Sequence, residues 1–284
     1  RSETQRLKSS RYSENGNRRK GFSNLPTAAR ATNAYPEKIW LYLHFPLLPI
    51  DALSDQSETN DSKQVPVAVV AQENNAMRVL CCSESAKQSG IEPQLSLSTA
   101  LALCPELLTL QRQPEREKTR LQQLALIAYS FSPVVIIDEK GLWLELSGCE
   151  KLFHSYRQLL QQLQTKLLHH CTDVAMGIAG SAYAARLLCQ PGFRCELPQS
   201  IELEQQFRRT SLNLLRVTKR QQQSFQQLGL TYLDDLLALP RAELASRFGT
   251  AIVEQLQLLL GEKPCQLKLF NPPATFHDLL QSPQ

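Results

Sequence analysis

The sequence lacks the features that would place a protein in a membrane or outside the cell. It has no run of about 18 apolar residues, so we expect no transmembrane helix and no membrane partner. No apolar segment of the secretory type opens the chain. The eight cysteines form no Cys-x-x-Cys pair, which argues against a disulfide framework and a zinc site. These absences predict a cytoplasmic globular protein without a bound metal or other cofactor.

Most of the chain also lacks an excess of basic charge. The net charge of +4 divides into +6 for residues 1–36 and −2 for the remaining 248 residues. The first segment is rich in Ser, Asn and Arg and has no apolar periodicity, so we predict a disordered basic tail. Residues 37–110 carry four basic and nine acidic groups, which makes them a poor surface for DNA.

The patterning after residue 36 predicts an α+β fold. Alternating apolar residues indicate strands at 39–45, 65–70, 77–82, 134–138, 142–146 and 174–178. Longer amphipathic patterns indicate helices at 115–131 and 151–171. From about residue 201 the pattern becomes a series of short helices separated by Gly and Pro. We therefore expect a mixed domain at 37–200 and an all-helical one at 201–264.

Several segments, in this order, resemble a known family. They are 66–69, 81–91, 100–105, 142–148, 177–179 and 228–230. Their order and spacing are similar to those of the palm, fingers and thumb of Y-family translesion DNA polymerases, the DinB/UmuC-type superfamily. Segments 43–53, 146–153 and 236–241 resemble the ImuB-like branch, the polymerase-like proteins of bacterial mutagenesis cassettes.

The resemblance implies a particular domain organisation. The palm would be ferredoxin-like, with a small fingers insertion at about 56–112. The thumb at 201–264 would hold a degenerate helix–hairpin–helix. Residues 265–284 would be a linker toward a little-finger domain that is absent or truncated here.

Nucleotidyl transfer requires carboxylates that hold two Mg²⁺ ions, and the resemblance implies where they should lie. The Asp of the first strand falls on Leu43, and the Asp-Glu pair of the central hairpin falls on Lys140 and Gly141. The acidic pair Asp138-Glu139 lies two residues earlier and could replace it, because a shift of two keeps the same faces of a strand. With no acid in the first strand, we expect a pseudo-polymerase.

The positions that would contact phosphate are also altered. The fingers contacts fall on Glu84 and Lys87, and Arg186 matches the phosphate-binding Lys of the family. Arg186 can equally be a solvated helix residue. The glycines of the thumb hairpin, which would offer backbone N–H groups to DNA, are replaced by Arg216 and Thr218.

The only basic cluster in the part of the chain that we expect to fold lies in the thumb, at residues 205–233, which contain no acid. It consists of Arg208, Arg209, Arg216, Lys219 and Arg220. These side chains either contact phosphate or form a solvated helix face.

Residues 266–270 resemble the Gln-Leu-x-Leu-Phe peptide that docks on the bacterial sliding clamp. In such a peptide the apolar side chains fill a pocket while the Gln binds at its rim. The alternative is a plain connecting strand between domains. The candidate docking residues are Gln266, Leu267, Leu269 and Phe270.

The leading hypothesis is therefore a non-catalytic adaptor in SOS-induced, mutagenic translesion synthesis. The resemblance implies as partners the sliding clamp, an ImuA-type RecA-like protein, an error-prone C-family DNA polymerase and, weakly, DNA. Two alternatives stay open. One is an active Y-family polymerase that uses Asp138 and Glu139, and the other is a general helix–hairpin–helix DNA-binding module.

Overall fold

The computed structural model describes residues 38–54, 65–189, 205–263 and 268–272. The predicted basic tail at 1–36 lies outside these residues, as does most of the predicted linker. Within the described residues, no helix is both long and apolar enough to cross a lipid bilayer. The cysteines in the described part of the chain are buried: Cys81, Cys82, Cys104, Cys149, Cys171 and Cys189.

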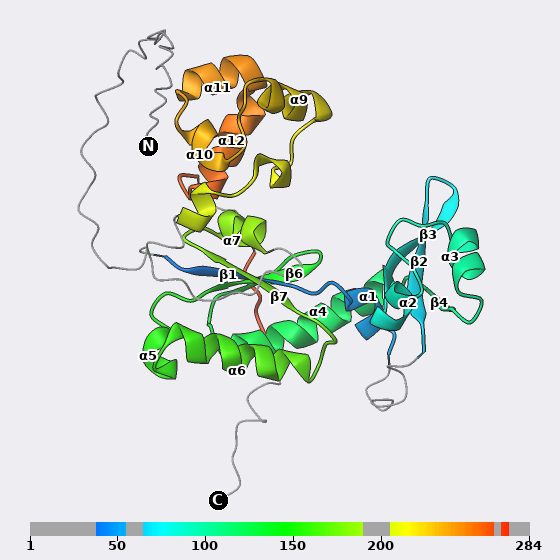
Figure 1. Ribbon diagram of the computed structural model, residues 1–284. Helices are drawn as coiled ribbons and strands as arrows, with labels where there is room; N and C mark the ends of the chain where they lie inside the picture. The colour runs from blue at the N-terminus through cyan, green and yellow to red at the C-terminus, as the bar shows by residue number, and fades with distance from the viewer. Residues whose placement is uncertain (1–37, 55–64, 190–204, 264–267, 273–284) are drawn as a thin grey trace, which may run out of the picture. The chain divides into compact units, whose positions relative to one another are not determined.

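The largest sheet is four-stranded and antiparallel, in the order β5-β6-β1-β7, and is called the palm sheet below. Its strands are β1 (Trp40–His44), β5 (Val135–Ile137), β6 (Gly141–Glu145) and β7 (Ala175–Ala179). Helix α4 (Pro114–Tyr129) connects β1 to β5, and helix α6 (Tyr156–Leu168) connects β6 to β7 (Figure 1). This β-α-β-β-α-β order, with the first strand between the third and the fourth, is that of a ferredoxin-like fold.

One face of the palm sheet forms the main core with α4 and α6. Alternate residues of each strand point toward the helices, as the two-residue period requires. The β1 and β6 residues on this face, Leu41, Leu43, Leu142 and Leu144, are fully buried, and they pack with Leu124, Leu159 and Leu163 of the two helices.

The single helix expected at 151–171 is in fact two helices. Helix α5 (Glu150–Phe153) ends at His154, whose φ of 62° is left-handed. Ser155 then caps α6, because its hydroxyl accepts a hydrogen bond from the N–H of Gln158. A serine cap restarts a helix readily, and the apolar periodicity continues across the break, so the sequence pattern conceals it.

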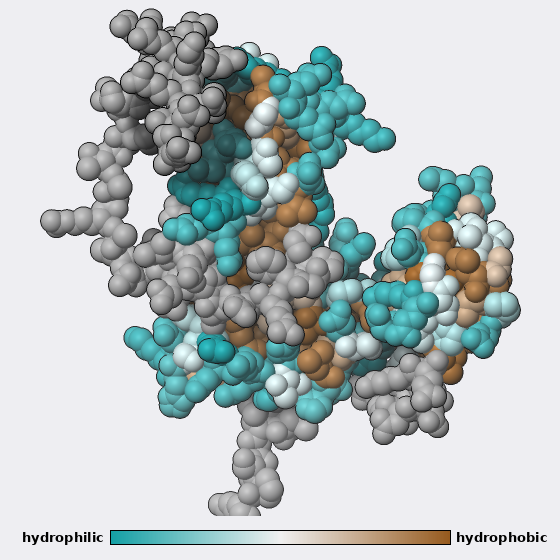
Figure 2. Space-filling view, viewed as in Figure 1, coloured by the Kyte–Doolittle hydropathy of each residue, from teal (hydrophilic) through white to brown (hydrophobic). Residues whose placement is uncertain are grey.

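A second sheet, called the fingers sheet below, lies in the chain between β1 and α4. Its order is β3-β2-β4, with strands β2 (Val67–Glu73), β3 (Ala76–Cys82) and β4 (Leu108–Gln111). Helices α2 (Glu84–Gln88) and α3 (Leu97–Leu103) complete it, and it has an apolar core of its own. Leu103 and Leu108 are about half exposed. Figure 2 shows hydrophobic residues among hydrophilic ones on the surface of this part of the chain.

The other face of the palm sheet is covered by α7 (Ala182–Leu188), which follows β7 directly. Gly177 makes this approach possible, because a Cβ there would collide with the backbone carbonyl of Ala185. The thumb helices are α9 (Lys219–Gln227), α10 (Leu233–Leu237), α11 (Arg241–Phe248) and α12 (Thr250–Leu259), preceded by the 3-10 turn η1 (Leu212–Leu214). They share one apolar cluster with α7, and the Ser181 hydroxyl donates to the Leu259 carbonyl at 2.6 Å.

Candidate functional site

Strand β1 places Leu43 and Tyr42 on opposite faces of the palm sheet, and Leu43 is not on the face that the resemblance implied. Leu43 points into the core between the sheet and α4 and α6. Tyr42 belongs to the apolar cluster of the opposite face, on the side of α7. The side chain of Leu43, which we expected at the position of the first acid, therefore lies on the face of the sheet opposite Asp138. The β1 residue that faces Asp138 is Tyr42.

Asp138, at the tip of the β5–β6 hairpin, is engaged inside the protein. The Tyr42 hydroxyl donates to Asp138 Oδ2 at 2.7 Å, and Arg186 Nη1 lies 3.1 Å from the same oxygen. The Asp138 side chain is only 12% exposed. This carboxylate oxygen thus has both a hydrogen-bond donor and a cation as neighbours.

Arg186 is fixed by more than this ion pair. Its guanidinium lies over the ring of Tyr42 at 5.6 Å and over that of Trp143 at 5.5 Å. Guanidinium groups favour such positions over aromatic faces. The two interpretations that the sequence allowed for Arg186 were a phosphate ligand and a solvated helix residue. The structure instead gives it an internal partner and two aromatic neighbours.

The surroundings shift the pKa values of two groups on this face. Burial, followed by the hydrogen bond to Asp138, raises the pKa of Tyr42 well above its ordinary value, so the phenol stays protonated and donates. Burial is also the main cause that lowers the pKa of His44, to which Lys140 and Arg186 add repulsion. His44 Nδ1 lies 3.1 Å from the Lys140 carbonyl oxygen, and this nitrogen donates because a carbonyl only accepts.

Gly141 has no room for a side chain. A Cβ there would collide with the backbone carbonyl of Leu43 and would lie 2.7 Å from the Tyr42 hydroxyl oxygen. Neighbouring Lys140 is exposed, as is Glu139. The two positions where the resemblance places the acidic pair therefore hold an exposed cation and a glycine with no space for a side chain.

These residues do not fit a site for two magnesium ions. Such a site needs several carboxylates that converge with free oxygens. Here Oδ2 of Asp138 is bound by Arg186 and Tyr42, Glu139 is exposed beside Lys140, and β1 contributes a phenol and an imidazole. Within the part of the chain that the structure describes, no group of three or more His, Cys, Asp or Glu side chains could hold a metal ion.

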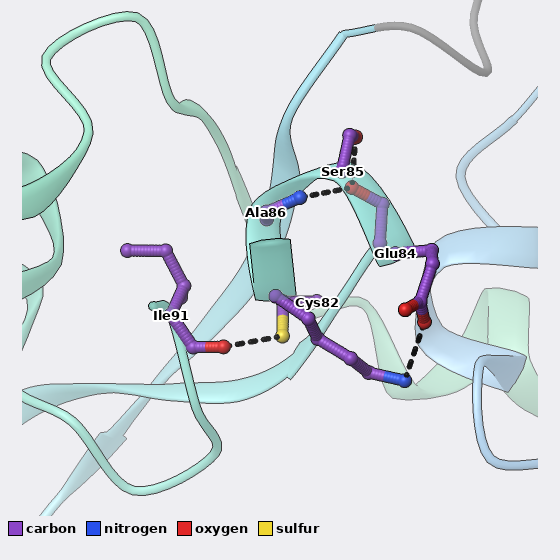
Figure 3. Close-up of polar contacts among 7 residues, drawn as sticks. Cys82, Glu84, Ser85, Ala86 and Ile91 are labelled. Atoms are coloured by element: carbon purple, nitrogen blue, oxygen red, sulfur yellow. Dashed lines mark hydrogen bonds and ion pairs between the residues drawn. The ribbon is translucent and has the colours of Figure 1, made fainter. Parts of the chain in front are cut away.

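The expected phosphate contacts of the fingers are paired with each other. Lys87 Nζ lies 3.2 Å from Glu84 Oε2, one turn apart on α2, and both side chains are at least half exposed. Figure 3 shows Glu84 and Ala86 near the start of α2. There the Ser83 hydroxyl accepts from the N–H of Ala86. The charge of Lys87 is therefore offset by its neighbour.

A pocket of about 300 Å³ lies between the end of β1, helix α1 (Leu48–Asp51) and the fingers sheet. Its lining is mainly apolar, with Lys87, Arg112 and Lys140 as its cations. Arg112 binds Glu117, another lining residue, through two contacts of 2.8 Å. The cations of this pocket are therefore partly neutralised within the protein.

The thumb turn also differs from a phosphate-binding glycine turn. Thr218 caps α9, and its own N–H donates to Gln221 Oε1 at 2.8 Å. The side-chain amide of Gln255 is oriented with its oxygen toward the backbone N–H of Arg216. That oxygen accepts from this N–H at 3.2 Å, and the NH2 group of the amide donates to the Arg216 carbonyl at 3.3 Å. Both backbone donors that a glycine turn would offer to DNA are therefore already bonded, so any phosphate contact here must come from side chains.

The five expected basic residues of the thumb fall into two groups. Arg208 lies 2.8 Å from Asp234 in an ion pair. The other four are exposed and form no ion pair with the described residues: Arg209, Arg216, Lys219 and Arg220. The second group provides the cationic surface of the thumb.

The candidate clamp peptide is partly docked on the palm sheet. Gln266 and Leu267 lie outside the described residues. Leu269 forms an isolated antiparallel bridge with Ile136, and its side chain is 53% exposed. Phe270 is half-buried and packs against the main core, and its N–H donates to the Val135 carbonyl at 2.8 Å.

Comparison with known proteins gives a family match for part of the chain. Residues 52–190 match the model of the impB/mucB/samB family. Residues 52–190 thus form a domain of this family. The chain is similar to the protein ImuB of Caulobacter vibrioides, with 31% identity over 67% of this chain and 42% of that protein. It is also similar to DNA polymerase IV of Dehalococcoides mccartyi, with 26% identity over 78% of this chain and 60% of that protein.

Solved structures bear out the expected α+β fold. The crystal structure of DinB from Sulfolobus solfataricus matches with a TM-score of 0.63 and 13% identity, over 81% of this chain and 69% of that chain. A ternary complex of Dbh DNA polymerase matches with a TM-score of 0.62 and 13% identity, over the same shares of the two chains. This chain thus spans about half the length of the curated relatives that it matches.

The sequence analysis missed the aromatic and imidazole side chains that lie beside Asp138, Arg186 and Lys140. From the sequence, Tyr42 and Trp143 were predicted only to be bulky strand residues, and His44 belonged to no recognised motif. The available signal was strand alternation, which places Tyr42 and His44 on one face of β1 and Leu43 on the other. A match to a motif does not by itself show on which face of a strand each residue lies.

Proposed function

We propose that this chain acts as a non-catalytic, polymerase-shaped adaptor in DNA damage tolerance and induced mutagenesis. The observation that supports it is the engagement of Asp138 by Tyr42 and Arg186. A carboxylate with a guanidinium 3.1 Å away is a poor magnesium ligand, because the metal must displace the resident cation. Gly141 and Tyr42 leave no space for a second carboxylate beside it.

The similarity to ImuB supports the cellular role. By that resemblance, the protein would act in the cytoplasm during the SOS response. It would link the sliding clamp to an ImuA-type RecA-like protein and an error-prone C-family polymerase. This chain covers 42% of the Caulobacter ImuB.

Contact with DNA would be made by the thumb. Arg209, Arg216, Lys219 and Arg220 supply exposed positive charge, whereas the hairpin amides at 216 and 218 are already bonded. Side-chain contacts of this kind bind phosphates without reading sequence. The proposed affinity is therefore weak, salt-dependent and independent of sequence.

Contact with the sliding clamp would be made by residues 266–270. The exposed Leu269 supports this, since an apolar side chain that is about half exposed is available to a partner's pocket. A pull-down with purified clamp would test it. We expect loss of binding with Leu269→Ala and Phe270→Ala and no loss with Lys268→Ala, which changes an exposed position within the same peptide.

Primer extension decides between the adaptor and the alternative of an active polymerase. The assay would use the purified protein with Mg²⁺ or Mn²⁺, with a DNA polymerase IV as positive control. We expect no incorporation above background. Incorporation that disappeared in Asp138→Asn/Glu139→Gln would overturn the proposal, because a contaminating polymerase would be unaffected by these substitutions.

A further inference from the structure

The edge of the palm sheet is covered by the chain's own segment 268–270. Strand β5 pairs with β6 on one side. On its other side, Ile136 bridges to Leu269 and the Val135 carbonyl accepts from the Phe270 N–H at 2.8 Å. Phe270 packs against the same core that α4 and α6 close. The segment thus extends the sheet by a short antiparallel contact and places one aromatic ring against the core.

The two side chains of this segment are used differently. Leu269 remains 53% exposed, whereas Phe270 is half-buried against the palm core. The attachment in the described residues consists of one bridge, one backbone hydrogen bond and one ring. Such a contact is weak compared with the strand pairs of the sheet, so a partner of moderate affinity can displace it.

Docking of the same peptide on another protein would need the ring of Phe270. In the proposed clamp contact, Leu269 and Phe270 fill one apolar pocket. The Phe270 ring cannot lie in that pocket and against the palm core at once. We infer that docking of residues 268–270 on β5 and docking on the sliding clamp exclude each other, so that the palm masks the clamp-binding peptide. This inference rests on the clamp contact put forward above.

A reversible cross-link can test this exclusion. Because the Phe270 N–H bonds to the Val135 carbonyl, the Ile136–Leu269 bridge is a non-hydrogen-bonded pair, and the adjoining antiparallel pair, Ile137 and Lys268, has the hydrogen-bonded register. The Cα atoms of such hydrogen-bonded pairs lie about 5.5 Å apart, within the range of about 4.4–6.8 Å that a disulfide spans. The variant Ile137→Cys/Lys268→Cys keeps Leu269 and Phe270, and it would hold the segment on β5 when oxidised and release it when reduced.

Affinity for the purified clamp would be measured for this variant in both redox states. We expect binding at least ten times weaker in the oxidised protein than in the same sample after reduction. The single variants Ile137→Cys and Lys268→Cys should bind equally in both states. Equal affinity of the oxidised and reduced double variant would overturn the inference and leave the clamp contact intact.

Two further measurements keep the inference testable if the double variant is unstable. In the unmodified protein, the amide of Phe270 should exchange with solvent more slowly than an unstructured amide. Exchange at the unstructured rate would contradict docking on β5. Absence of clamp binding by the unmodified protein would overturn the clamp contact and this inference together, and the unmodified sample distinguishes that outcome from a failure of exclusion.

Discussion

The phenol ring of Tyr42 occupies the space that a side chain at Gly141 would need. A Cβ at Gly141 would lie 2.7 Å from the Tyr42 hydroxyl oxygen and 2.8 Å from its Cζ, and it would also collide with the Leu43 carbonyl. Part of the obstacle is therefore backbone, which cannot rotate away. An aromatic residue on β1 and a glycine on β6 thus form a matched pair on the face that carries Asp138.

The first prediction follows from this pair. Gly141→Ala should destabilise the protein by about 3 kcal/mol, at the upper end of typical overpacking costs, because the obstacle is partly main chain. Thermal or urea unfolding measures the change. Gly148→Ala is the matched control, since open space surrounds Gly148 and only its φ of +77° opposes a side chain. It should cost about 1 kcal/mol.

The variant Tyr42→Ala/Gly141→Ala should not recover wild-type stability, because the Leu43 carbonyl remains in place. If Gly141→Ala unfolded like the wild type, the space beside Tyr42 would be larger than the structure implies.

A second prediction concerns the coupling of Tyr42, Asp138 and Arg186. Tyr42→Phe removes one hydrogen bond to a charged group, which should cost about 1.5–3 kcal/mol. Arg186→Met removes the cation from a carboxylate that is only 12% exposed. Because both residues contact the same oxygen, the double variant should depart from the sum of the single variants by about 0.5 kcal/mol or more.

Unfolding by urea, analysed as a double-mutant cycle, measures this coupling. Tyr129→Phe is a suitable control, because Tyr129 lies on α4 against the other core. Strict additivity of Tyr42→Phe and Arg186→Met would contradict the shared contact with Asp138.

The extended elements were predictable from the sequence where the pattern was strong and local. The apolar alternation at 39–45 predicted β1, which the structure gives as Trp40–His44. Strand β4 escaped prediction because Leu108–Gln111 is only four residues long and its outer side chains are exposed. It forms only because β2 offers a parallel edge to it, a condition that no local pattern reveals.

The candidate site was less predictable, because its contacts join distant parts of the chain. Tyr42, Asp138 and Arg186 lie on β1, a hairpin tip and α7, and only the folded sheet brings them together. The sequence itself shows that the first strand contains no acid. It could not predict that Arg186 would lie beside Asp138, because no spacing rule relates residues 138 and 186.

A third prediction concerns the pH dependence of stability through Asp51. Its buried carboxylate accepts hydrogen bonds from the Thr172 N–H at 3.1 Å and from the Thr172 hydroxyl at 2.5 Å. Burial raises its pKa above 3.8, with Asp173 adding to the rise and Thr172 and Arg120 opposing it. A raised folded-state pKa contributes stability that is complete below the unfolded pKa and is lost as the pH rises through the folded one.

The difference in unfolding free energy between the wild type and Asp51→Asn should therefore fall as the pH is raised from about 3.5 through the folded-state pKa. Asp51→Asn keeps an acceptor for Thr172 but does not titrate. Urea unfolding at a series of pH values measures the difference, and Asp173→Asn controls for the neighbouring charge. A difference that grew with pH would show that the hydrogen bonds of Thr172 outweigh burial.

The last prediction separates the two groups of thumb cations. Arg216, Lys219 and Arg220 are exposed without an ion pair among the described residues, whereas Arg208 is held by Asp234 at 2.8 Å. Each phosphate contact that is removed should lower the slope of log affinity against log salt by about 0.9 for duplex DNA. Arg216→Ala/Arg220→Ala should therefore weaken binding of any duplex sequence and lower the slope of its salt dependence by nearly two.

The control is Arg208→Ala, which should change the slope little, because its charge is already neutralised. Fluorescence anisotropy with a labelled duplex at several salt concentrations measures both variants. An equal loss in the two would mean that the thumb presents its charge as a diffuse field rather than through these side chains.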